Sequence, residues 1–235
     1  MSQTMRVDVW SDISCPWCYV GKSRFGKAVE RFGREVEVRH RSFELDPSRG
    51  TEETEQVVAM LSRKYGMSAE QAQAGEHRLQ GLAAAEGLEY RAEGRDHGGS
   101  FDIHRLLHLA AERGLADRAW QAFYTANFAE EASLFSRDRI AEVAVGAGLD
   151  RDEVLAVLDD PAAYGDAVRA DEAEAASLGA NGVPFFVIDG KYGVSGAQPT
   201  EVFAEILEKA WSEREPKLTT LGGDSEACGP DGCAL

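Results

Sequence analysis

The sequence predicts an α/β fold whose halves come from the two ends of the chain, with an all-helical domain inserted between them. Three observations carry this prediction: strand patterns near the start, strand patterns near the end, and a long stretch rich in alanine, glutamate and leucine in the middle. The chain has 235 residues, which suffices for one domain with a large insertion. A helical bundle alone does not fit, because the strands at the two ends need each other as partners.

The first half of the predicted sheet lies within the first forty-odd residues. Met5–Trp10 alternates in polarity and is rich in valine, which is typical of a strand. Trp17–Phe32 carries apolar side chains at helical spacing, and Val36–Phe43 alternates again. A helical crossover joins the two strands, so we expect them to run parallel.

The middle of the chain, residues 51–178, has the composition of helices throughout. Glycines interrupt it at several places, for example Gly66, Gly87 and Gly114. Several segments between these breaks show the apolar stripe of a helix that packs on one side, and we expect roughly six helices.

The second half of the predicted sheet follows. Val183–Ile188 reads as a buried strand headed by a proline, Asp189-Gly190 as a hairpin turn, and Lys191–Ser195 as the return strand. Thr200 is the expected N-cap of a last amphipathic helix.

This order of elements is that of a thioredoxin-like fold with a helical domain inserted in its middle. We expect residues 1–50 and 179–212 to form a discontinuous thioredoxin-like domain and residues 51–178 the insertion. Residues 213–235 are polar and rich in glycine, which predicts a flexible C-terminal tail.

Charge and composition exclude some classes of function. The chain has 41 acidic and 25 basic residues, a formal net charge of -16, which disfavours a nucleic-acid partner. No stretch approaches the roughly 18 apolar residues that a membrane span needs. The first residues show no secretory signal pattern, so we expect a cytoplasmic protein, where a cysteine pair more often means redox catalysis or metal binding.

The four cysteines form two close pairs, and the first pair predicts redox chemistry. Cys15 and Cys18 frame the motif Cys-Pro-Trp-Cys where a predicted strand has ended and a helix begins. The amides and the macrodipole at a helix N-terminus stabilise a thiolate, so Cys15 is the expected exposed nucleophile. Cys18 lies within bonding reach and is the expected buried thiol that resolves a mixed disulfide.

Three further residues are expected to bind substrate. In the thioredoxin architecture a cis-proline heads a strand beside the active-site pair, and Pro184 matches that place. Taken alone, Pro184 is an ordinary strand-start proline; together with the cysteine pair, a cis bond after Val183 is the better interpretation. The segment then offers its backbone edge to an extended peptide. Trp17 is expected to contact apolar segments of the substrate.

The sequence resembles the DsbA-like branch of the thioredoxin superfamily, and within it the FrnE-like proteins. The resemblance covers about residues 5–210, and its blocks are DVWSDISCPWCYVGK at 8–22, FDIHRL at 101–106, GANGVPFFVI at 179–188 and YGVSGAQ at 192–198. It implies a disulfide oxidoreductase or isomerase that acts on thiol- or disulfide-containing proteins. We expect no bound cofactor, and glutathione or thioredoxin as a redox partner.

The second cysteine pair, Cys228 and Cys233, lies in the tail. Some FrnE-like proteins carry a C-terminal pair with the same spacing, which strengthens the resemblance. A disulfide that closes so small a loop adds little stability, so we expect the pair to relay electrons to or from the first pair. The linker from Ser212 to Ala227 has 16 residues and as a random coil would span roughly 20–25 Å.

Two alternatives stay open. The first is a glutathione-dependent enzyme resembling 2-hydroxychromene-2-carboxylate isomerases and kappa-class glutathione transferases, which typically have a serine at the glutathione-facing turn; Cys18 argues against it. The second is a non-enzymatic binding module in which the four cysteines hold zinc. His104 and His108 share one helix face, but packing is the better interpretation, and no metal site is expected.

Overall fold

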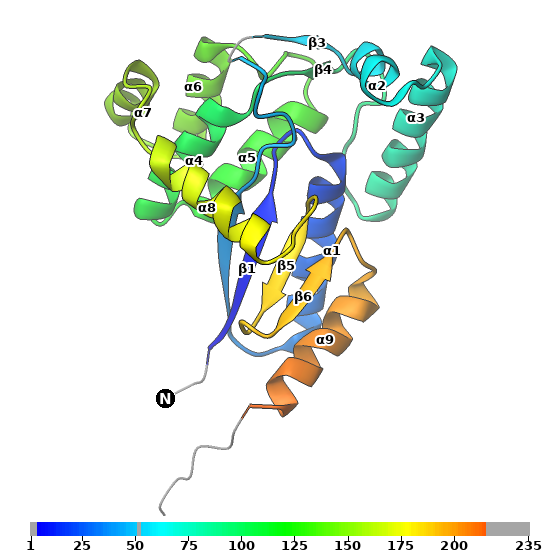
Figure 1. Ribbon diagram of the computed structural model, residues 1–235, viewed down its shortest axis with the longest axis vertical. Coiled ribbons are helices and arrows are strands. Elements are labelled where there is room, and N and C mark those ends of the chain that lie inside the picture. The colour runs from blue at the N-terminus through cyan, green and yellow to red at the C-terminus, as the bar shows by residue number, and fades with distance from the viewer. Residues whose placement is uncertain (1–3, 51–52, 215–235) are drawn as a thin grey trace, which may run out of the picture.

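A four-stranded sheet built from both ends of the chain lies at the centre of the protein. The computed structural model describes residues 4–50 and 53–214, and the strands lie in the order β2-β1-β5-β6 (Figure 1). Their bounds are β1 Met5–Ser11, β2 Val36–Ser42, β5 Phe185–Ile188 and β6 Tyr192–Ser195. The parallel pairing of β1 and β2 is confirmed, whereas β5 runs antiparallel to β1 and β6 antiparallel to β5.

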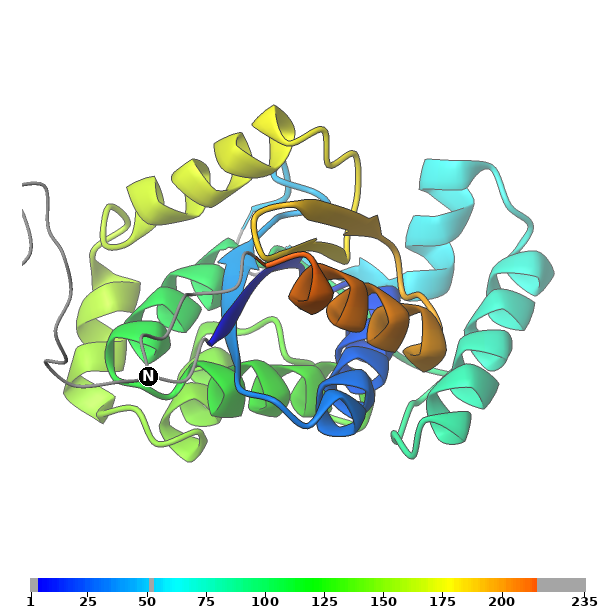
Figure 2. The same cartoon turned by 90° about the horizontal axis from the view of Figure 1, so that it is seen from below.

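Helices α1 and α9 cover one face of this sheet. α1 spans Pro16–Phe32 and α9 spans Thr200–Ser212, and they lie side by side in Figure 2. Side chains alternate between the faces of a strand, so every second residue of β1 points to these helices. The apolar cluster formed there contains Met5, Val7, Val9, Phe25, Phe186 and Phe203.

Helix α8, which spans Gly165–Ser177, covers the opposite face. Trp10 of β1 points to this side, where it packs with Phe185 and Ala175. The indole Nε1 of Trp10 donates a hydrogen bond to the carbonyl of Asp171, N···O 2.8 Å. The last helix of the predicted insertion therefore also forms a layer on the central sheet.

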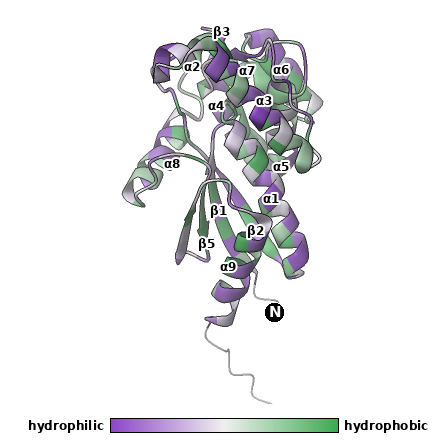
Figure 3. Ribbon diagram, turned by 90° about the vertical axis from the view of Figure 1, so that its right-hand side faces the viewer, coloured by the Kyte–Doolittle hydropathy of each residue, from purple (hydrophilic) through white to green (hydrophobic). Residues whose placement is uncertain are grey.

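The remaining helices lie beyond the end of the sheet at which β1 finishes (Figure 1). Their bounds are α2 Val57–Tyr65, α3 Ala69–Ala85, α4 Phe101–Glu112, α5 Ala116–Phe128, α6 Arg137–Gly146 and α7 Arg151–Asp159. Hydrophilic and hydrophobic residues are interleaved along them (Figure 3), as in helices buried on one side. In the described part of the chain, no helix is long and apolar enough to cross a membrane.

Three sequence expectations need correction. The insertion is not entirely helical, because β3 (Glu55–Gln56) pairs antiparallel with β4 (Asp96–His97). Two-residue strands are too short to give an alternation signal. In addition, seven helices, α2 to α8, lie in residues 53–178 rather than six. The breaks before α6 and α8 contain no glycine; Pro161 marks the second.

The start of α9 also differs from the sequence expectation. Its N-cap is Pro199, and Thr200 is already helical. The Thr200 hydroxyl donates to the carbonyl of Arg24 in α1, O···O 3.3 Å. This buried threonine therefore joins α9 to α1 instead of capping its own helix.

Candidate active site

The loop between β1 and α1 carries the predicted catalytic pair. Cys15 is the N-cap of α1, with φ -89° and ψ 112°, and Pro16 takes the first turn of the helix. Proline fits there because an amide at that position has no intrahelical acceptor. The Cys15 carbonyl accepts the amides of Cys18 (3.1 Å) and Tyr19 (3.3 Å). The helix therefore begins at the first cysteine, with the second cysteine about one turn later.

The first thiol is covered more closely than expected. Cys15 is 4% exposed and Cys18 is 1% exposed, so the expectation of an exposed Cys15 is wrong and that of a buried Cys18 is confirmed. The Val183–Pro184 peptide bond is cis, as the sequence predicts. The Cys15 thiol donates to the carbonyl of Val183, S···O 3.6 Å, and packing of this segment explains why Cys15 is covered.

Gly21 allows the proline to approach α1 closely. A Cβ atom at this position would lie 3.0 Å from Cγ of Pro184 and 3.4 Å from Cβ of Ala197. Gly26, further along the same helix, has nothing within 4 Å of its Cβ position. The close contact with Pro184, rather than the helix itself, therefore favours glycine at position 21.

A buried pair of side chains, Asp12 and His104, supports the catalytic loop. Oδ1 of Asp12 lies 3.5 Å from Nε2 of His104, and the two side chains are 1% and 0% exposed. The Asp12 carboxylate accepts the amides of Ser14 (3.1 Å) and Leu45 (2.7 Å), and its carbonyl accepts the amide of Cys15 (3.2 Å). Burial opposes ionisation, but His104 and the two amides outweigh it and lower the pKa of Asp12 to about 2. Asp12 is therefore an anion that orders the backbone before Cys15.

A groove of about 420 Å³ opens beside Cys15, between the catalytic loop and helices α2 and α3. The lining of this Cys15 groove includes Cys15, Trp17, Leu45, Met60, Leu61, Tyr65, Leu79 and His97. Trp17, Leu45 and Tyr65 are 41%, 37% and 63% exposed. Among residues 4–50 and 53–214, only one further large hydrophobic side chain, Leu178, is as exposed. The exposed apolar surface is thus concentrated beside Cys15.

Cys18 faces a different space, a cavity of about 290 Å³ between α1, α5 and the sheet. The polar lining of this Cys18 cavity is Ser11, Cys18, Lys22, Glu30, His40, Asp117 and Tyr124, with apolar side chains such as Val9, Phe25 and Phe186 completing it. Gly26, Glu30 and Asp117 are exposed, which locates its opening to solvent. Each thiol therefore lines its own cavity.

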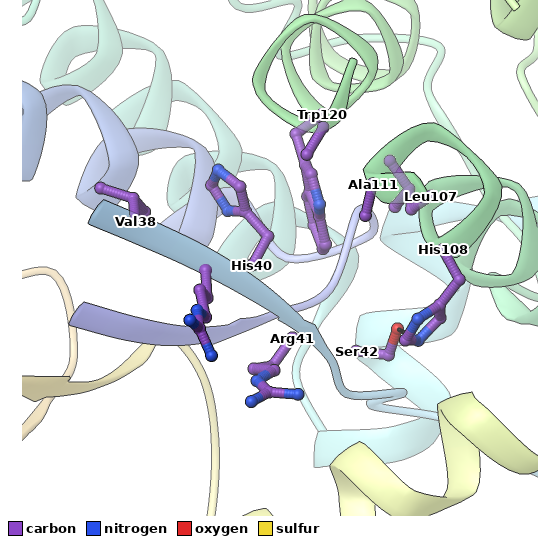
Figure 4. Close-up of a pocket in the computed structure, with 10 residues that line it drawn as sticks. Val38, His40, Arg41, Ser42, Leu107, His108, Ala111 and Trp120 are labelled. Atoms are coloured by element: carbon purple, nitrogen blue, oxygen red, sulfur yellow. Dashed lines mark hydrogen bonds between the residues drawn. The ribbon is translucent and has the colours of Figure 1, made fainter. Parts of the chain in front are cut away.

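His40 of β2 lines both the Cys18 cavity and a third cavity, of about 330 Å³. The third cavity lies between β2, α4 and α5 (Figure 4). The His40 ring stacks on Trp120 with centroids 5.3 Å apart, and its Nε2 is 2.8 Å from Oδ1 of Asp117. On the far side of this third cavity, Nε2 of His108 lies 3.2 Å from Oδ2 of Asp171. Both histidines are therefore already paired with carboxylates.

Several groups around Cys18 have shifted pKa values. Burial raises the pKa of the Cys18 thiol well above its usual value, and the neighbouring Cys15 thiol adds to the effect. Burial lowers the pKa of Lys22, against the attraction of Asp117. Burial raises the pKa of the Tyr124 hydroxyl well above its usual value, and the neighbouring Ser11 side chain only partly opposes this. Cys18 is accordingly held as a neutral thiol.

Metal-ligating side chains do not gather in the described residues. Within 4–50 and 53–214, no three His, Cys, Asp or Glu side chains are placed to hold a metal ion. His104 and His108 pair with Asp12 and Asp171 instead of sharing a site. The predicted accessory pair, Cys228 and Cys233, lies outside the described residues.

Sequence reasoning assigned no role to Asp12, Lys22 or His97. His97 lies in β4, far from the cysteines in sequence, and lines the Cys15 groove; its Nε2 lacks a hydrogen-bond partner among the described residues. Only the tertiary fold brings it there. A signal for Lys22 was present, because it follows Cys18 by four residues on the same helix face.

Comparison with known proteins places these features in a family context. A model of the DsbA-like thioredoxin domain matches residues 6–208. The crystal structure of the probable DsbA oxidoreductase SCO1869 from Streptomyces coelicolor is 63% identical, covers 98% of this chain and 99% of that chain, and has a TM-score of 0.87. The uncharacterized protein YwbO from Bacillus subtilis is 47% identical over 45 residues, which are 19% of this chain and 22% of that protein.

More distant structures share the fold. The cytosolic disulfide reductase DsbM from Pseudomonas aeruginosa, in a structure with GSH, is 19% identical, covers 88% of this chain and 99% of that chain, and has a TM-score of 0.61. A 2-hydroxychromene-2-carboxylate isomerase is 20% identical, covers 88% and 95% of the two chains, and also has a TM-score of 0.61. The predicted thioredoxin-like fold with a helical insertion is confirmed.

Proposed function

The chain belongs to the DsbA-like thioredoxin family, and on that premise we propose that it is a thiol–disulfide oxidoreductase that acts on protein substrates. An oxidoreductase or isomerase is the coarse function that the family supports. The observation that carries the finer proposal is the position of Cys15. It caps α1 beside the Val183–Pro184 segment and lines the Cys15 groove, while Cys18 lies buried about one turn later.

The proposed reaction consists of two thiol–disulfide exchanges. The Cys15 thiolate, stabilised by the N-terminus of α1, attacks a substrate disulfide; one substrate sulfur leaves as a thiolate and a mixed disulfide forms at Cys15. Cys18 then loses its proton and attacks Sγ of Cys15. The second substrate thiolate leaves, and a Cys15–Cys18 disulfide remains. The substrate has been reduced by two electrons and the protein oxidised by two. The same steps in reverse oxidise a substrate dithiol.

The Cys15 groove favours a polypeptide substrate. Trp17, Leu45 and Tyr65 offer apolar contact area that a disordered or partly folded chain would cover. The Val183–Pro184 segment offers a backbone edge beside the thiol, suited to an extended peptide. A cysteine flanked by large apolar residues is therefore the preferred target.

The test combines a redox titration with two variants. Reduced protein is equilibrated in a series of glutathione redox buffers, alkylated, and its thiols counted by intact mass; we expect Cys15 and Cys18 to interconvert as one dithiol–disulfide couple. With insulin as the probe, Cys15→Ser abolishes disulfide reduction. Cys18→Ser leaves a mixed disulfide at Cys15 that does not turn over. Undiminished insulin reduction by Cys18→Ser would overturn the two-cysteine reaction.

The same samples decide between the alternatives. Turnover of glutathione conjugates that survives Cys18→Ser would favour the isomerase or transferase alternative, for which the distant isomerase shows a shared fold alone. Thiols that resist alkylation, with one zinc ion retained in native mass spectrometry, would favour the four-cysteine zinc module. A protein that retains no metal and titrates as one dithiol–disulfide couple would contradict both alternatives.

We further propose that the reaction takes place in the cytoplasm with glutathione or thioredoxin as the redox partner. The fold shared with the cytosolic reductase from Pseudomonas aeruginosa agrees with this proposal. A midpoint potential more negative than about -220 mV, the upper end of the range of cytosolic glutathione, would suit a reductant there. A midpoint near -120 mV, as in strongly oxidising family members, would contradict that role.

A further inference from the structure

We propose that Lys22 exchanges the proton of Cys18 during the resolving step, through the Cys18 cavity and away from the bound substrate. The proposal rests on the proposed function, because it requires Cys18 to act as the resolving thiol. It assigns the cavity on the far side of the active-site helix to proton transfer and leaves the Cys15 groove to the substrate.

The placement of Lys22 carries the proposal. Cys18 and Lys22 are four residues apart on α1, so their side chains leave the same face of the helix one above the other. Both line the Cys18 cavity. Among the described residues, no hydrogen bond or ion pair engages the Lys22 amine. By contrast, Lys27 on the same helix is bound to the Glu86 carboxylate at 2.5 Å.

The Cys18 thiol needs a proton acceptor because only the thiolate attacks a disulfide. Its burial works against ionisation, since it raises the pKa of Cys18. Burial of Lys22 acts in the complementary direction, because it lowers the pKa of the ammonium group and brings the two groups closer to a matched pair. The lowered pKa makes the neutral amine, which is the form that accepts a proton, easier to reach than in an exposed lysine.

The other titratable groups around the cavity are less suitable acceptors. Asp117 of α5 is bound to His40 of β2, N···O 2.8 Å. Glu30 lies at the exposed opening of the cavity, further along α1. Tyr124 of α5 has a raised pKa and stays protonated. Asp12, which also lies near the Cys18 thiol, has a pKa of about 2 and is too weak a base for a thiol.

The cavity itself is suited to conduct a proton. Its volume of about 290 Å³ exceeds what several water molecules need, at about 30 Å³ each. The neighbouring hydroxyls of Ser11 and Tyr124 both line the cavity and offer hydrogen bonds to such water. The exposed residues Gly26 and Glu30 mark the end from which a proton leaves to solvent.

With Cys15 in a mixed disulfide, the proton of the Cys18 thiol passes to the neutral Lys22 amine, directly or through water, and gives an ammonium. The Cys18 thiolate attacks Sγ of Cys15, the bond between Cys15 and the substrate sulfur breaks, and the substrate leaves as a thiolate. Lys22 then releases the proton to solvent. In the reverse reaction the ammonium protonates the departing Cys18 thiolate.

The test separates the two sulfur attacks. Reduced protein, in a Cys228→Ser/Cys233→Ser background, is mixed with excess dithiobis-nitrobenzoate, an aromatic disulfide that releases a coloured thiolate at each exchange. The first release reports attack by Cys15 and the second reports attack by Cys18. We expect Lys22→Met to slow the second release by about 100-fold, the usual lower range of general-base catalysis, and to leave the first unchanged. The rate of the slowed phase should rise in proportion to hydroxide concentration.

Two further variants decide the role of the lysine. Lys22→Arg keeps the charge but stays protonated, so it should be as slow as Lys22→Met. Lys27→Met removes the same charge from α1 outside the cavity and should match the unsubstituted protein. A second release at the original rate in Lys22→Met or in Lys22→Arg would overturn the proposal. If the Cys228→Ser/Cys233→Ser protein with Lys22 intact releases only one equivalent of coloured thiolate, the two-cysteine reaction itself is wrong. That result is distinguishable from a failure of the Lys22 proposal alone, in which the second equivalent is released at the original rate.

Discussion

Asp12 is buried at the catalytic loop and has a pKa of about 2, well below its ordinary value of 3.8. Its carboxylate has no access to water and is balanced by His104 and by the amides of Ser14 and Leu45. Such an arrangement is costly to disrupt from one side, because the remaining partner is left buried and unpaired. The buried Asp12 carboxylate therefore acts on the catalytic loop through the backbone hydrogen bond between Asp12 and Cys15.

Asp12→Asn should lower the free energy of unfolding in a pH-dependent way. The pKa of Asp12 falls from 3.8 to about 2 on folding, so its charge adds about 2 kcal/mol of stability at pH 7. A lowered pKa gives stability that is complete above about pH 4 and is lost as the pH falls towards 2. Urea denaturation should show a gap of about 2 kcal/mol between the two proteins at pH 7 and about half of it near pH 3. An equal gap at both pH values would assign the effect to lost packing instead of charge.

Helix α1 carries most of the active site because its different faces meet different surroundings. Cys15 and Trp17 at its start line the Cys15 groove, whereas Cys18 and Lys22 line the Cys18 cavity. Cys15 is the N-cap and precedes the helical turns, so its side chain is not held to the helix face that Cys18 and Lys22 share. Gly21 lies where the Pro184 ring approaches, so the helix also sets the position of the cis-proline segment.

The two glycines of α1 offer a matched test of this contact. Gly26→Ala adds a methyl group in open space and should stabilise the protein by about 0.5–1 kcal/mol through helix propensity. Gly21→Ala brings the same propensity but places its Cβ 3.0 Å from Pro184. Overpacking costs about 1–3 kcal/mol, so Gly21→Ala should be less stable than Gly26→Ala by at least about 1 kcal/mol in urea denaturation. Equal stabilities would contradict a tight contact between α1 and Pro184.

Elements with a strong local signal were predictable from the sequence. The alternating Met5–Trp10 and the helical spacing of Trp17–Phe32 depend on neighbours in sequence, and both were located within a residue of β1 and α1. The two-residue strands β3 and β4 have no such signal. Thr200 was misjudged for a related reason, because its hydroxyl binds a carbonyl of α1 that only the folded chain brings near.

The candidate site divides in the same way. The cysteine motif and the proline at 184 are readable because their chemistry is local. The Cys18 cavity is not, because Asp117 and Tyr124 reach it from α5, about a hundred positions away in the chain, a separation at which no periodic pattern carries information. The exposure of Cys15 was misjudged because the Val183–Pro184 segment that covers it comes from the other end of the chain.

At the scale of the whole molecule, the described chain ends far from the catalytic loop. Trp211 near the end of α9 packs on Phe32 at the end of α1, with ring centroids 5.8 Å apart. Cys15 lies at the opposite end of this 17-residue helix, a length of about 25 Å. Figure 1 shows α9 leaving the molecule at the end away from the helical insertion. A C-terminal cysteine pair must therefore return along the length of α1 to meet Cys15.

The expected reach of the linker makes this return testable. Its random-coil span of roughly 20–25 Å is close to the distance to be covered, so we propose that Cys228 and Cys233 meet the first pair at an effective concentration near the millimolar range. Reoxidation of the Cys15–Cys18 dithiol by glutathione disulfide, followed by alkylation and intact mass, should then be slower in Cys228→Ser/Cys233→Ser. Removing half of the linker while keeping both cysteines reduces the expected span to about 15 Å and should slow reoxidation equally. Unchanged reoxidation in the double variant would contradict the relay, and a slow double variant with a fast shortened linker would show that the pair acts without spanning this distance.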